Sequence, residues 1–458
     1  MVKIPRRLDD ILPTLTMEKL LDVLQQPDIS GKVREALHQV GLHDAAPIDR
    51  VREAWQQARG WLDSVTESVA GATTYPRALN GSGQMLSSSF VAVPWGTVVA
   101  YEFAKVATDY QSHSNLMRQA EELTRRQFGN QATTYLSSTS EALRLLASSP
   151  AASDGVVVAR VDAVRIAGLG DIRSMLAAAT NPLVEIGAAN GVRAEEWSQA
   201  LRSPRQMVVL ASPNNLPLKE RRQLRLDAIA AAKACGAKVI EVLADGVVSP
   251  PLIEHYQFPD VAQACESGAD VVILPSQFLL GGPLGAVVIG QQELVSRLHA
   301  KADEIGVLLS GAQLLAVVSA IKNAAKQEPD QASVADYLMA NPENLRNRAR
   351  RLAVQLTEMG EVGQAVECEL TTPLGPSPWN NYQLQSWGVR LSPRNSLAEL
   401  VRQVARGESK NGLQLEVIRE AESLAISLRF IPPQYDHEIV LIVGGSTAAG
   451  KPEEAAST

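Results

Sequence analysis

The most constraining feature of the sequence is a series of short apolar, β-rich stretches that alternates with helical stretches between about residues 75 and 335. We expect strands at 133–136, 155–159, 183–186, 207–211, 238–242, 271–274 and 285–289. Strands that are apolar along their whole length and separated by helices are typical of a parallel sheet with helices on both faces. Residues 287–289 follow Leu274 too closely for a crossover helix, so we predict that this last strand is antiparallel.

The chain has 458 residues, which is too long for one ordinary core, and changes in pattern divide it into four segments. Residues 1–72 show helical spacing only, and we predict a helical domain there. Residues 73–337 form the large α/β domain, and residues 338–446 form a smaller α/β domain. The tail, 447–458, is polar and rich in small residues, so we predict that it is disordered.

The smaller domain is predicted from a helix over 341–359 followed by strands near 386–391, 413–418 and 423–430. The helix carries four arginines, at positions Arg346, Arg348, Arg350 and Arg351. On a helix these side chains spread over two faces with acidic residues nearby. We therefore interpret them as a solvated face rather than as a phosphate or RNA site.

Composition and charge exclude several functional classes. Hydrophobic residues make up 45% and charged residues 20% of the chain, as in globular proteins, and the net charge of −7 gives no general attraction to nucleic acid or anionic lipid. The N-terminus lacks an apolar signal segment and the apolar runs are too short to span a membrane, so we expect a cytoplasmic protein without membrane contact. The three cysteines and six histidines are scattered, which predicts neither disulfides nor a metal site.

One strand–turn–helix junction has the composition of an anion site. The strand that ends at Leu136 is followed by four hydroxyl residues and then by a helix: Ser137, Ser138, Thr139 and Ser140. Free backbone N–H groups at a helix N-terminus, together with short hydroxyl side chains, form a cup that suits phosphate or sulfate. Taken alone, the same residues are better explained as a helix cap that Glu141 completes.

The segment Gly268–Gly285 contains the motif Phe278-Leu279-Leu280-Gly281-Gly282-Pro283 after an apolar strand. This motif resembles the Lys-Leu-Leu-Gly-Gly-Pro segment of the bacterial selenocysteine synthase (L-seryl-tRNA(Sec) selenium transferase) family. Further segments resemble that family in the same order and with similar spacing: Leu79–Gly83, Leu183–Gly191, Val239–Gly246 and Ser386–Leu391. The resemblance covers most of the chain.

The resemblance implies fold type I of the pyridoxal-phosphate (PLP) enzymes. Such a chain has a mostly parallel seven-stranded large domain, a small C-terminal α/β domain and, in this family, an N-terminal helical domain. The family uses PLP held as an imine by a lysine, and its unit is an obligate dimer that assembles into larger rings. In this family the N-terminal domain holds the tRNA.

The sequence departs from the family at the residues that carry its chemistry. Phe278 occupies the position of the Schiff-base lysine, and Val242 occupies that of the acid that pairs with the pyridinium nitrogen. The positions of the family's active-site arginines are all apolar here: Ala92, Ile305 and Leu308. Asp245 and Gln277 are the polar residues that remain in this degenerate cleft.

These departures favour a pseudoenzyme that keeps the fold and oligomer, binds no PLP and acts as a scaffold, partner or regulator. One alternative is a different chemistry in the same cleft that uses Asp245, Glu241, Ser137 and Gln277. Another is a working selenium transferase or a related ammonia-lyase-type PLP enzyme, in which Asp245 supplies the missing acid and Lys238 or Lys301 lies nearby. All three readings remain open at this point.

We expect a homo-oligomer that is at least a dimer, formed through the large domain. An extension of this prediction is that dimers assemble into a larger ring. Residues 1–70 carry nine Lys or Arg and eleven Asp or Glu, so tRNA binding by this segment is not expected. The sequence does not indicate a particular protein partner.

Overall fold

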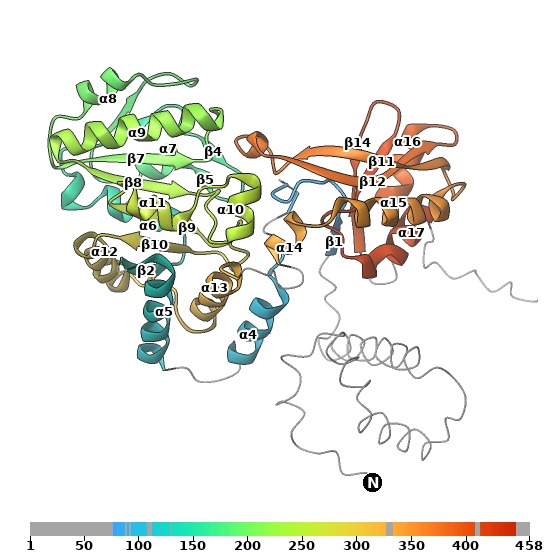
Figure 1. Cartoon of the computed structure of the whole chain (residues 1–458), viewed down its shortest axis with the longest axis horizontal. Coiled ribbons are helices and arrows are strands. Elements are labelled where there is room, and N and C mark those ends of the chain that lie inside the picture. Colours follow the sequence, from blue (N-terminus) through green and yellow to red (C-terminus); the bar gives the residue numbers. More distant parts are fainter. Residues whose placement is uncertain are drawn as a thin grey trace, which may run out of the picture. The chain divides into compact units, whose positions relative to one another are not determined.

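The computed structural model describes residues 77–87, 89–90, 93–107, 112–129, 131–326, 333–407 and 413–445. These residues fall in one compact unit that spans 76–458. Figure 1 shows a larger α/β part around a long sheet and a smaller, mainly C-terminal α/β part. The predicted N-terminal helical domain, 1–72, and the predicted disordered tail, 447–458, lie outside the described residues.

The larger part is built on a seven-stranded sheet with the order β2-β10-β9-β8-β7-β3-β6. Its strands are β2 (Ala132–Leu136), β3 (Gly155–Ala159), β6 (Leu183–Ile186), β7 (Gln206–Ser212), β8 (Lys238–Leu243), β9 (Val271–Pro275) and β10 (Ala286–Gly290). Strands β6, β3, β7, β8 and β9 pair in parallel, whereas β10 is antiparallel to both β9 and β2. The predicted strands and the predicted antiparallel member are confirmed.

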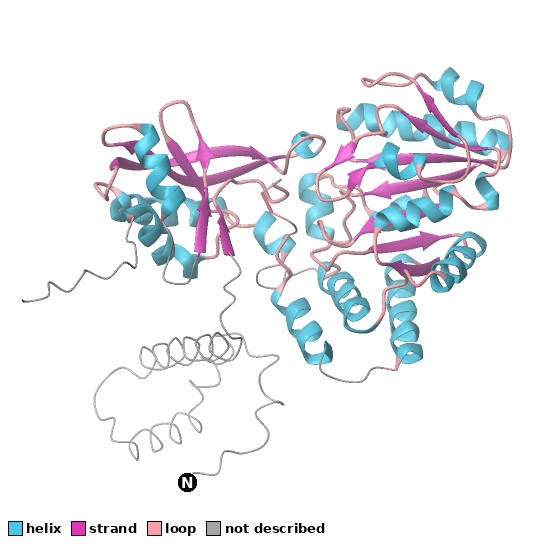
Figure 2. Cartoon of the chain, turned by 180° about the vertical axis from the view of Figure 1, so that it is seen from behind, coloured by secondary structure: helices cyan, strands magenta, loops and turns pink. Residues whose placement is uncertain are grey.

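Helices connect the strands and cover both faces of this sheet (Figure 2). They are α4 (Thr97–Ala107), α5 (His113–Phe128), α6 (Thr139–Ala147), α7 (Ile172–Ala177), α8 (Ala194–Ala200), α9 (Leu218–Cys235), α10 (Pro250–Tyr256), α11 (Val261–Glu266), α12 (Gln292–Glu304), α13 (Gly311–Ala324) and α14 (Val334–Leu338). Local sequence sets several ends: Asp171 and Asp260 cap α7 and α11, and α9 ends at Gly236 in the left-handed conformation. A short hairpin, β4 (Arg165–Ile166) with β5 (Gly170–Asp171), precedes α7.

The two faces of the sheet belong to different apolar clusters because side chains alternate along each strand. On one face, Val209, Ile240 and Val242 pack in a cluster with residues of α6, α7 and α12. On the other face, Leu210 and Leu243 pack in clusters with residues of α9 and α11. This division places Val242 and its neighbours in β8 on opposite sides of the molecule's main sheet.

The smaller part has a four-stranded antiparallel sheet with the order β11-β12-β15-β14. Its elements are β11 (Val362–Pro373), β12 (Gln383–Pro393), β14 (Ile418–Arg419), β15 (Leu424–Ser427), α15 (Pro342–Leu356), α16 (Leu397–Arg406) and α17 (Asp436–Gly444). The predicted helix and the strands near 386–391 and 423–430 are confirmed. Strand β11, which pairs along most of β12, was not predicted.

One domain boundary differs from the sequence prediction. Strand β1 (Arg77–Asn80) pairs in parallel with β13 (Leu413–Glu416), and Leu79 is buried in the core of the smaller part. The amide of Ser427 also donates a hydrogen bond to the carbonyl of Gly81. The large domain therefore does not begin at residue 73, because this first strand belongs to the C-terminal part.

The arginines of α15 are not a solvated face throughout, so that prediction is wrong for Arg348. Its guanidinium is buried, pairs with Asp436 at 2.5 Å and donates to the carbonyls of Leu428 and Ile431. Arg346 lies over the ring of Trp387, with 4.7 Å between the guanidinium carbon and the ring centroid. The helix uses these arginines to attach to neighbouring elements.

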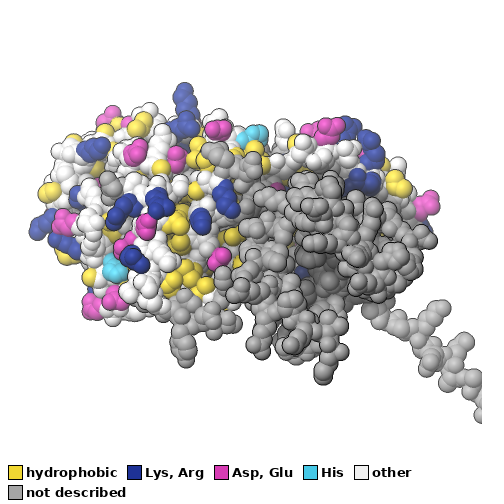
Figure 3. All heavy atoms as spheres, turned by 60° about the horizontal axis from the view of Figure 1, so that its bottom comes forward, with side chains coloured by type: hydrophobic (Ala, Val, Ile, Leu, Met, Phe, Trp, Pro, Cys, Tyr) yellow, Lys and Arg dark blue, Asp and Glu magenta, His cyan; other side chains and the backbone are white. Residues whose placement is uncertain are grey.

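The surface of the described residues shows no separation of charge by sign on the face drawn in Figure 3, where basic and acidic side chains are interspersed. Among the helices of the described ranges, none is both long enough and apolar enough to cross a membrane.

Candidate functional site

The polar residues of interest lie where parallel strands of the large sheet end. Asp162 follows β3, Ser212 and Asn214 lie at the end of β7, and Asp245 follows β8. The carboxyl ends of parallel strands meet at one edge of a sheet, which is where ligand sites of α/β proteins lie. The turn that carries Phe278 follows β9 at the same edge.

Phe278 is buried in the apolar cluster that also contains Val242. Its ring packs edge-on against the ring of Trp379, with 5.3 Å between centroids. A methyl group added at Gly168 would lie 2.9 Å from Cε1 of Phe278, so the backbone approaches this ring closely. The turn itself is held by a hydrogen bond from the Ser276 hydroxyl to the carbonyl of Pro283. The aromatic side chain is therefore an integral part of the core.

Gln277 and Val242 complete this apolar region. The Gln277 amide nitrogen lies 3.4 Å from the carbonyl oxygen of Gly168, and its own Oε1 is buried without a hydrogen-bond partner among the described residues. Val242 is fully buried in the middle of the sheet. Apart from Gln277, the predicted cleft residues that meet here offer only hydrocarbon.

Asp245 belongs to a closed polar network rather than to this apolar region. The Ser212 hydroxyl donates to its Oδ1 at 2.6 Å, and Arg221 of α9 donates to its Oδ2 at 2.8 Å. Tyr382, from the C-terminal part, donates to the same Oδ2 at 2.5 Å and accepts a hydrogen bond from Arg221 at 2.7 Å. Asp245 is fully buried, so this network compensates a charge that would otherwise be costly.

The pKa values of the partners reflect the coupling in this network. Burial raises the pKa of Tyr382 well above its usual value, and the nearby carboxylate of Asp245 adds to the rise. Burial would lower the pKa of Arg221, but Asp245 and Tyr382 more than offset it, and the pKa lies above its ordinary value. The Arg221 guanidinium and the Tyr382 hydroxyl of this network therefore both keep their protons at neutral pH.

Asp162 is a buried acid whose pKa is raised toward neutrality. Burial raises its pKa to about 7, against a hydrogen bond of 2.6 Å that the Asn214 amide donates to its Oδ1. Its Oδ2 is buried and has no hydrogen-bond partner among the described residues. Such a carboxyl can donate or accept a proton at physiological pH, which is the property of a binding or acid–base group.

The hydroxyl-rich turn before α6, where the sequence predicts an anion cup, caps the helix. The Ser138 side chain accepts from the amide of Glu141 at 3.2 Å as the helix cap, and the amide of Ser137 donates to the carbonyl of Val307 at 2.9 Å. Thr139 is buried with its hydroxyl unpartnered among the described residues, and Ser140 is half-buried. Two of the turn's amides are thus already satisfied by protein acceptors.

The structure brings one of the predicted arginine positions close to this turn. Leu308 forms a bridge with Leu136, next to the Ser137 amide. Ile305 ends α12 and is 41% exposed, so it does not join the apolar region around Phe278 in this chain. Ala92 lies outside the described residues.

Sequence reasoning missed the partners that close the polar network around Asp245, and it also missed a separate hydrogen-bonded pair. The network partners are Arg221, Tyr382 and Ser212, and the pair is Asp162 with Asn214. A signal existed for three of them, because Asp162, Ser212 and Asn214 are polar residues directly at the ends of parallel strands. Arg221 and Tyr382 had none, since they lie on a helix and in a distant part of the chain. No group of three or more potential metal-ligating side chains occurs within the described ranges, and the three cysteines there are free thiols.

Comparison with known proteins agrees with this architecture. The solved structure of D-glucosaminate-6-phosphate ammonia-lyase superposes with a TM-score of 0.59 at 14% identity, covering 82% of this chain and 96% of that one. This likeness, together with the sheet order, shows that the chain has the α/β fold known as fold type I among PLP-dependent enzymes.

The family follows from the sequence matches. The L-seryl-tRNA selenium transferase family model matches residues 97–428, and the chain belongs to this family. The L-seryl-tRNA(Sec) selenium transferase of Moorella thermoacetica is 25% identical over 275 residues, and the match spans only 58% of that relative and 58% of this chain. That of Carboxydothermus hydrogenoformans is 21% identical over 443 residues, 93% of each chain.

Proposed function

We propose that this protein is a selenium transferase-like pseudoenzyme, which keeps the family's fold and has lost its PLP-dependent chemistry. The observation that carries the proposal is the packing of Phe278. PLP catalysis needs a primary amine at this position, to hold the cofactor as an imine and to move a proton. Phe278 has no amine, and its ring is fixed in the core against Trp379 and Gly168.

The surroundings of Phe278 support the same conclusion. Val242 cannot pair with a pyridinium nitrogen, and both oxygens of Asp245 already bind Ser212, Arg221 and Tyr382. The residues present therefore do not fit PLP, and a shifted Asp245 does not supply the missing acid.

The two lysines considered as substitutes are also engaged elsewhere. Lys238 begins β8, at the opposite end of the strand from Asp245, and pairs with Asp270 at 3.1 Å. Lys301 is exposed on α12 and pairs with Glu304 at 2.8 Å. Neither lysine replaces the family's Schiff-base group in this arrangement.

An absorption spectrum tests the proposal directly. The full-length protein is purified, incubated with PLP, treated with borohydride and digested for peptide mapping. We expect no visible band from a bound imine and no reduced PLP–lysine peptide. A specific, stoichiometric label on one lysine would overturn the proposal. A relative with an intact Lys-Leu-Leu-Gly-Gly-Pro motif serves as the positive control.

We further propose that the chain is a homo-oligomer, at least a dimer, whose contact includes the large part. Helix α4 supports this, because Val98 and Tyr101 are 39% and 46% exposed on a mainly apolar helix. Light scattering at low micromolar concentration should give at least twice the 49.2 kDa of one chain. A stable, folded monomer would contradict this.

Binding of tRNA is not part of the proposed function. The acidic balance of residues 1–70 does not suit the release of counterions from a phosphate backbone. A gel-shift experiment with total tRNA at physiological salt should show no submicromolar complex. A salt-dependent complex that disappears on removal of residues 1–72 would reverse this expectation.

A further inference from the structure

A cavity lies on the other face of the large sheet from Val242. It has a volume of about 510 Å³ and is enclosed by β7, β8, α9, α11 and the segment 257–260. Glu241 and Leu243 face it, whereas Val242 between them points to the opposite face. The volume lies in the range of small-molecule sites in proteins.

The walls of this cavity are mainly apolar. Five large side chains from different elements contribute to them: Leu210, Leu224, Leu243, Ile253 and Phe258. Leu226 also lines the cavity and is 56% exposed, so it lies at the mouth. Hydrocarbon that faces an open space of this size suits the apolar body of a ligand.

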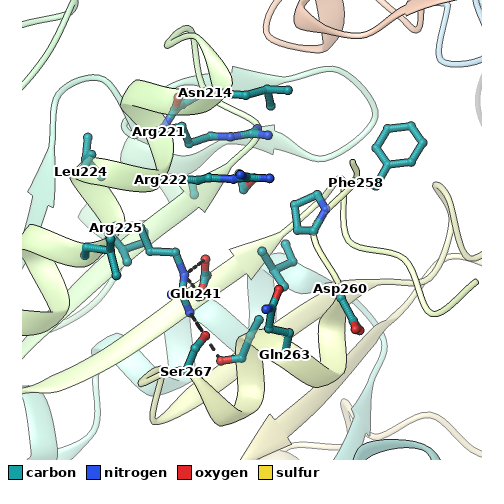
Figure 4. Close-up of a pocket in the computed structure, with 18 of the residues that line it drawn as sticks. Asn214, Arg221, Arg222, Leu224, Arg225, Glu241, Phe258, Asp260, Gln263 and Ser267 are labelled. Atoms are coloured by element: carbon teal, nitrogen blue, oxygen red, sulfur yellow. Dashed lines mark hydrogen bonds and ion pairs between the residues drawn. The ribbon is translucent and has the colours of Figure 1, made fainter. Parts of the chain in front are cut away.

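Three arginines of α9 line the same space, and two of them are neutralised. Arg221 pairs with Asp245 at 2.8 Å, and Arg225 holds both oxygens of Glu241 at 2.8 and 2.9 Å. Arg222 has no ion pair or hydrogen bond within the described ranges. Figure 4 shows its side chain extending from α9 across the cavity toward the segment of Phe258. An unpaired guanidinium over an apolar pocket favours an anionic group.

Asp162 provides a second polar anchor, independent of Arg222. It lines the cavity, is fully buried, and has one oxygen without a hydrogen-bond partner among the described residues. Buried polar atoms in proteins are nearly always satisfied by protein, water or ligand. Because burial raises its pKa to about 7, this carboxyl can meet either a donor or an acceptor near neutral pH.

We propose that this cavity binds a small amphiphilic organic anion. Its apolar body lies against the leucines and Phe258, its anionic group contacts Arg222, and a hydroxyl or N–H group contacts Asp162. The site is separate from the region of Phe278, so it stands whether or not the chain binds PLP.

The test uses 8-anilinonaphthalene-1-sulfonate, a fluorescent anion with an apolar body, titrated into the full-length protein. We expect saturable binding that Arg222→Met weakens about tenfold or more, since a hydrogen bond to a charged group contributes on that scale. Arg351→Met, which changes an exposed arginine on α15, should leave the affinity unchanged. Both positions are exposed, so neither change threatens folding.

Two further measurements locate the probe. Leu226→Trp narrows the mouth and should also weaken binding, while circular dichroism confirms the fold. In displacement assays, 6-hydroxy-2-naphthalenesulfonate should compete better than 2-naphthalenesulfonate, and Asp162→Ala should remove this difference. Absent binding, or equal affinity in the wild type, Arg222→Met and Leu226→Trp, would overturn the proposal. A hydroxyl preference that survives Asp162→Ala would overturn the role of that residue.

Discussion

Strand β8 carries two adjacent residues whose side chains lie in different environments, Glu241 and Val242. Glu241 faces α9 and α11, where Arg225 holds both of its oxygens. Val242 faces α6 and α7, at the position where the family has an acid, and only apolar groups share its cluster. A buried carboxylate is tolerated where a complete set of partners surrounds it and is costly where a partner is missing. The two faces of one strand thus separate an environment in which a buried carboxylate is paired from an apolar one.

The two faces of the sheet also differ in the space beside them. On the face with Phe278, apolar side chains pack into the core around this ring. The face with Arg221 and Asp162 carries charged side chains, a cavity and a carboxyl group, that of Asp162, whose pKa is about 7. We therefore expect the proposed ligand on the face of the sheet that carries Arg222 and Asp162.

The largest effect is expected from breaking the buried network on the charged face. Arg221→Met leaves Asp245 buried without its cation, which should lower the free energy of unfolding by roughly 3–5 kcal/mol. Urea denaturation measures this, with the double variant Arg221→Met/Asp245→Leu expected to regain much of the loss. Arg297→Met, in the exposed pair with Glu293, should cost less than about 1 kcal/mol. Equal losses in both single variants would contradict the comparison.

The second effect concerns the pH dependence of stability. The pKa of Asp162 is about 7 in the folded protein and 3.8 in the unfolded reference. Between pH 3.8 and about 7, this carboxyl is therefore protonated in the folded state and ionised in the unfolded state. Stability must then fall as pH rises from about 4 to 7 and level off above, by up to about 4 kcal/mol.

Asp162→Asn should flatten this dependence, and the difference from the wild type should be largest at pH 8. Thermal or urea unfolding at pH 5, 6, 7 and 8 measures it. Glu422→Gln, an exposed acid on the smaller part, is the control and should keep the wild-type slope. A parallel slope in Asp162→Asn would show that this carboxyl does not titrate near neutrality.

The third effect tests the apolar face. Phe278→Ala removes a buried ring and its contact with Trp379, which should cost about 3 kcal/mol through lost burial and the cavity left behind. Urea denaturation again provides the measurement. A change below about 1 kcal/mol would mean that the ring is not packed into the core, and that the region around it remains open to a ligand.

The smallest effect is expected at an aligned arginine position. Ile305→Ser changes an exposed side chain at the end of α12 and should alter the stability of the chain by less than about 0.5 kcal/mol. Light scattering of the same variant adds a second readout. A large loss of stability together with dissociation would place Ile305 in a contact between copies.

The sequence predicted the large sheet closely because its strands are apolar on both faces and separated by helices. It predicted the antiparallel β10 from the short distance after Leu274. It missed β11, whose alternation is carried by small residues such as Ala365 and Cys368 and interrupted by a bulge after Val362. Side-chain pattern alone cannot reveal a strand whose buried positions are this weakly apolar.

The site was predicted where a family motif passed through it, at Phe278 and Val242. The polar network was not predicted, since Asp245 lies 24 residues from Arg221 and 137 from Tyr382, and no local spacing connects them. A long separation in sequence also explains why the burial of Arg348 was not predicted, because its acid partner Asp436 is 88 residues away. Buried ion pairs of this kind depend on tertiary arrangement, which a linear pattern does not encode.

The pairing of β1 with β13 has a consequence for synthesis on the ribosome. Residues 77–80 emerge early, but their partner strand, 413–416, follows more than 300 residues later. At ordinary elongation rates this interval lasts on the order of tens of seconds. During that time the early strand presents unpaired backbone groups, which the matching strand of a neighbouring nascent chain can capture. We therefore expect correct pairing to be favoured when the large α/β part folds before the early strand meets a neighbouring chain.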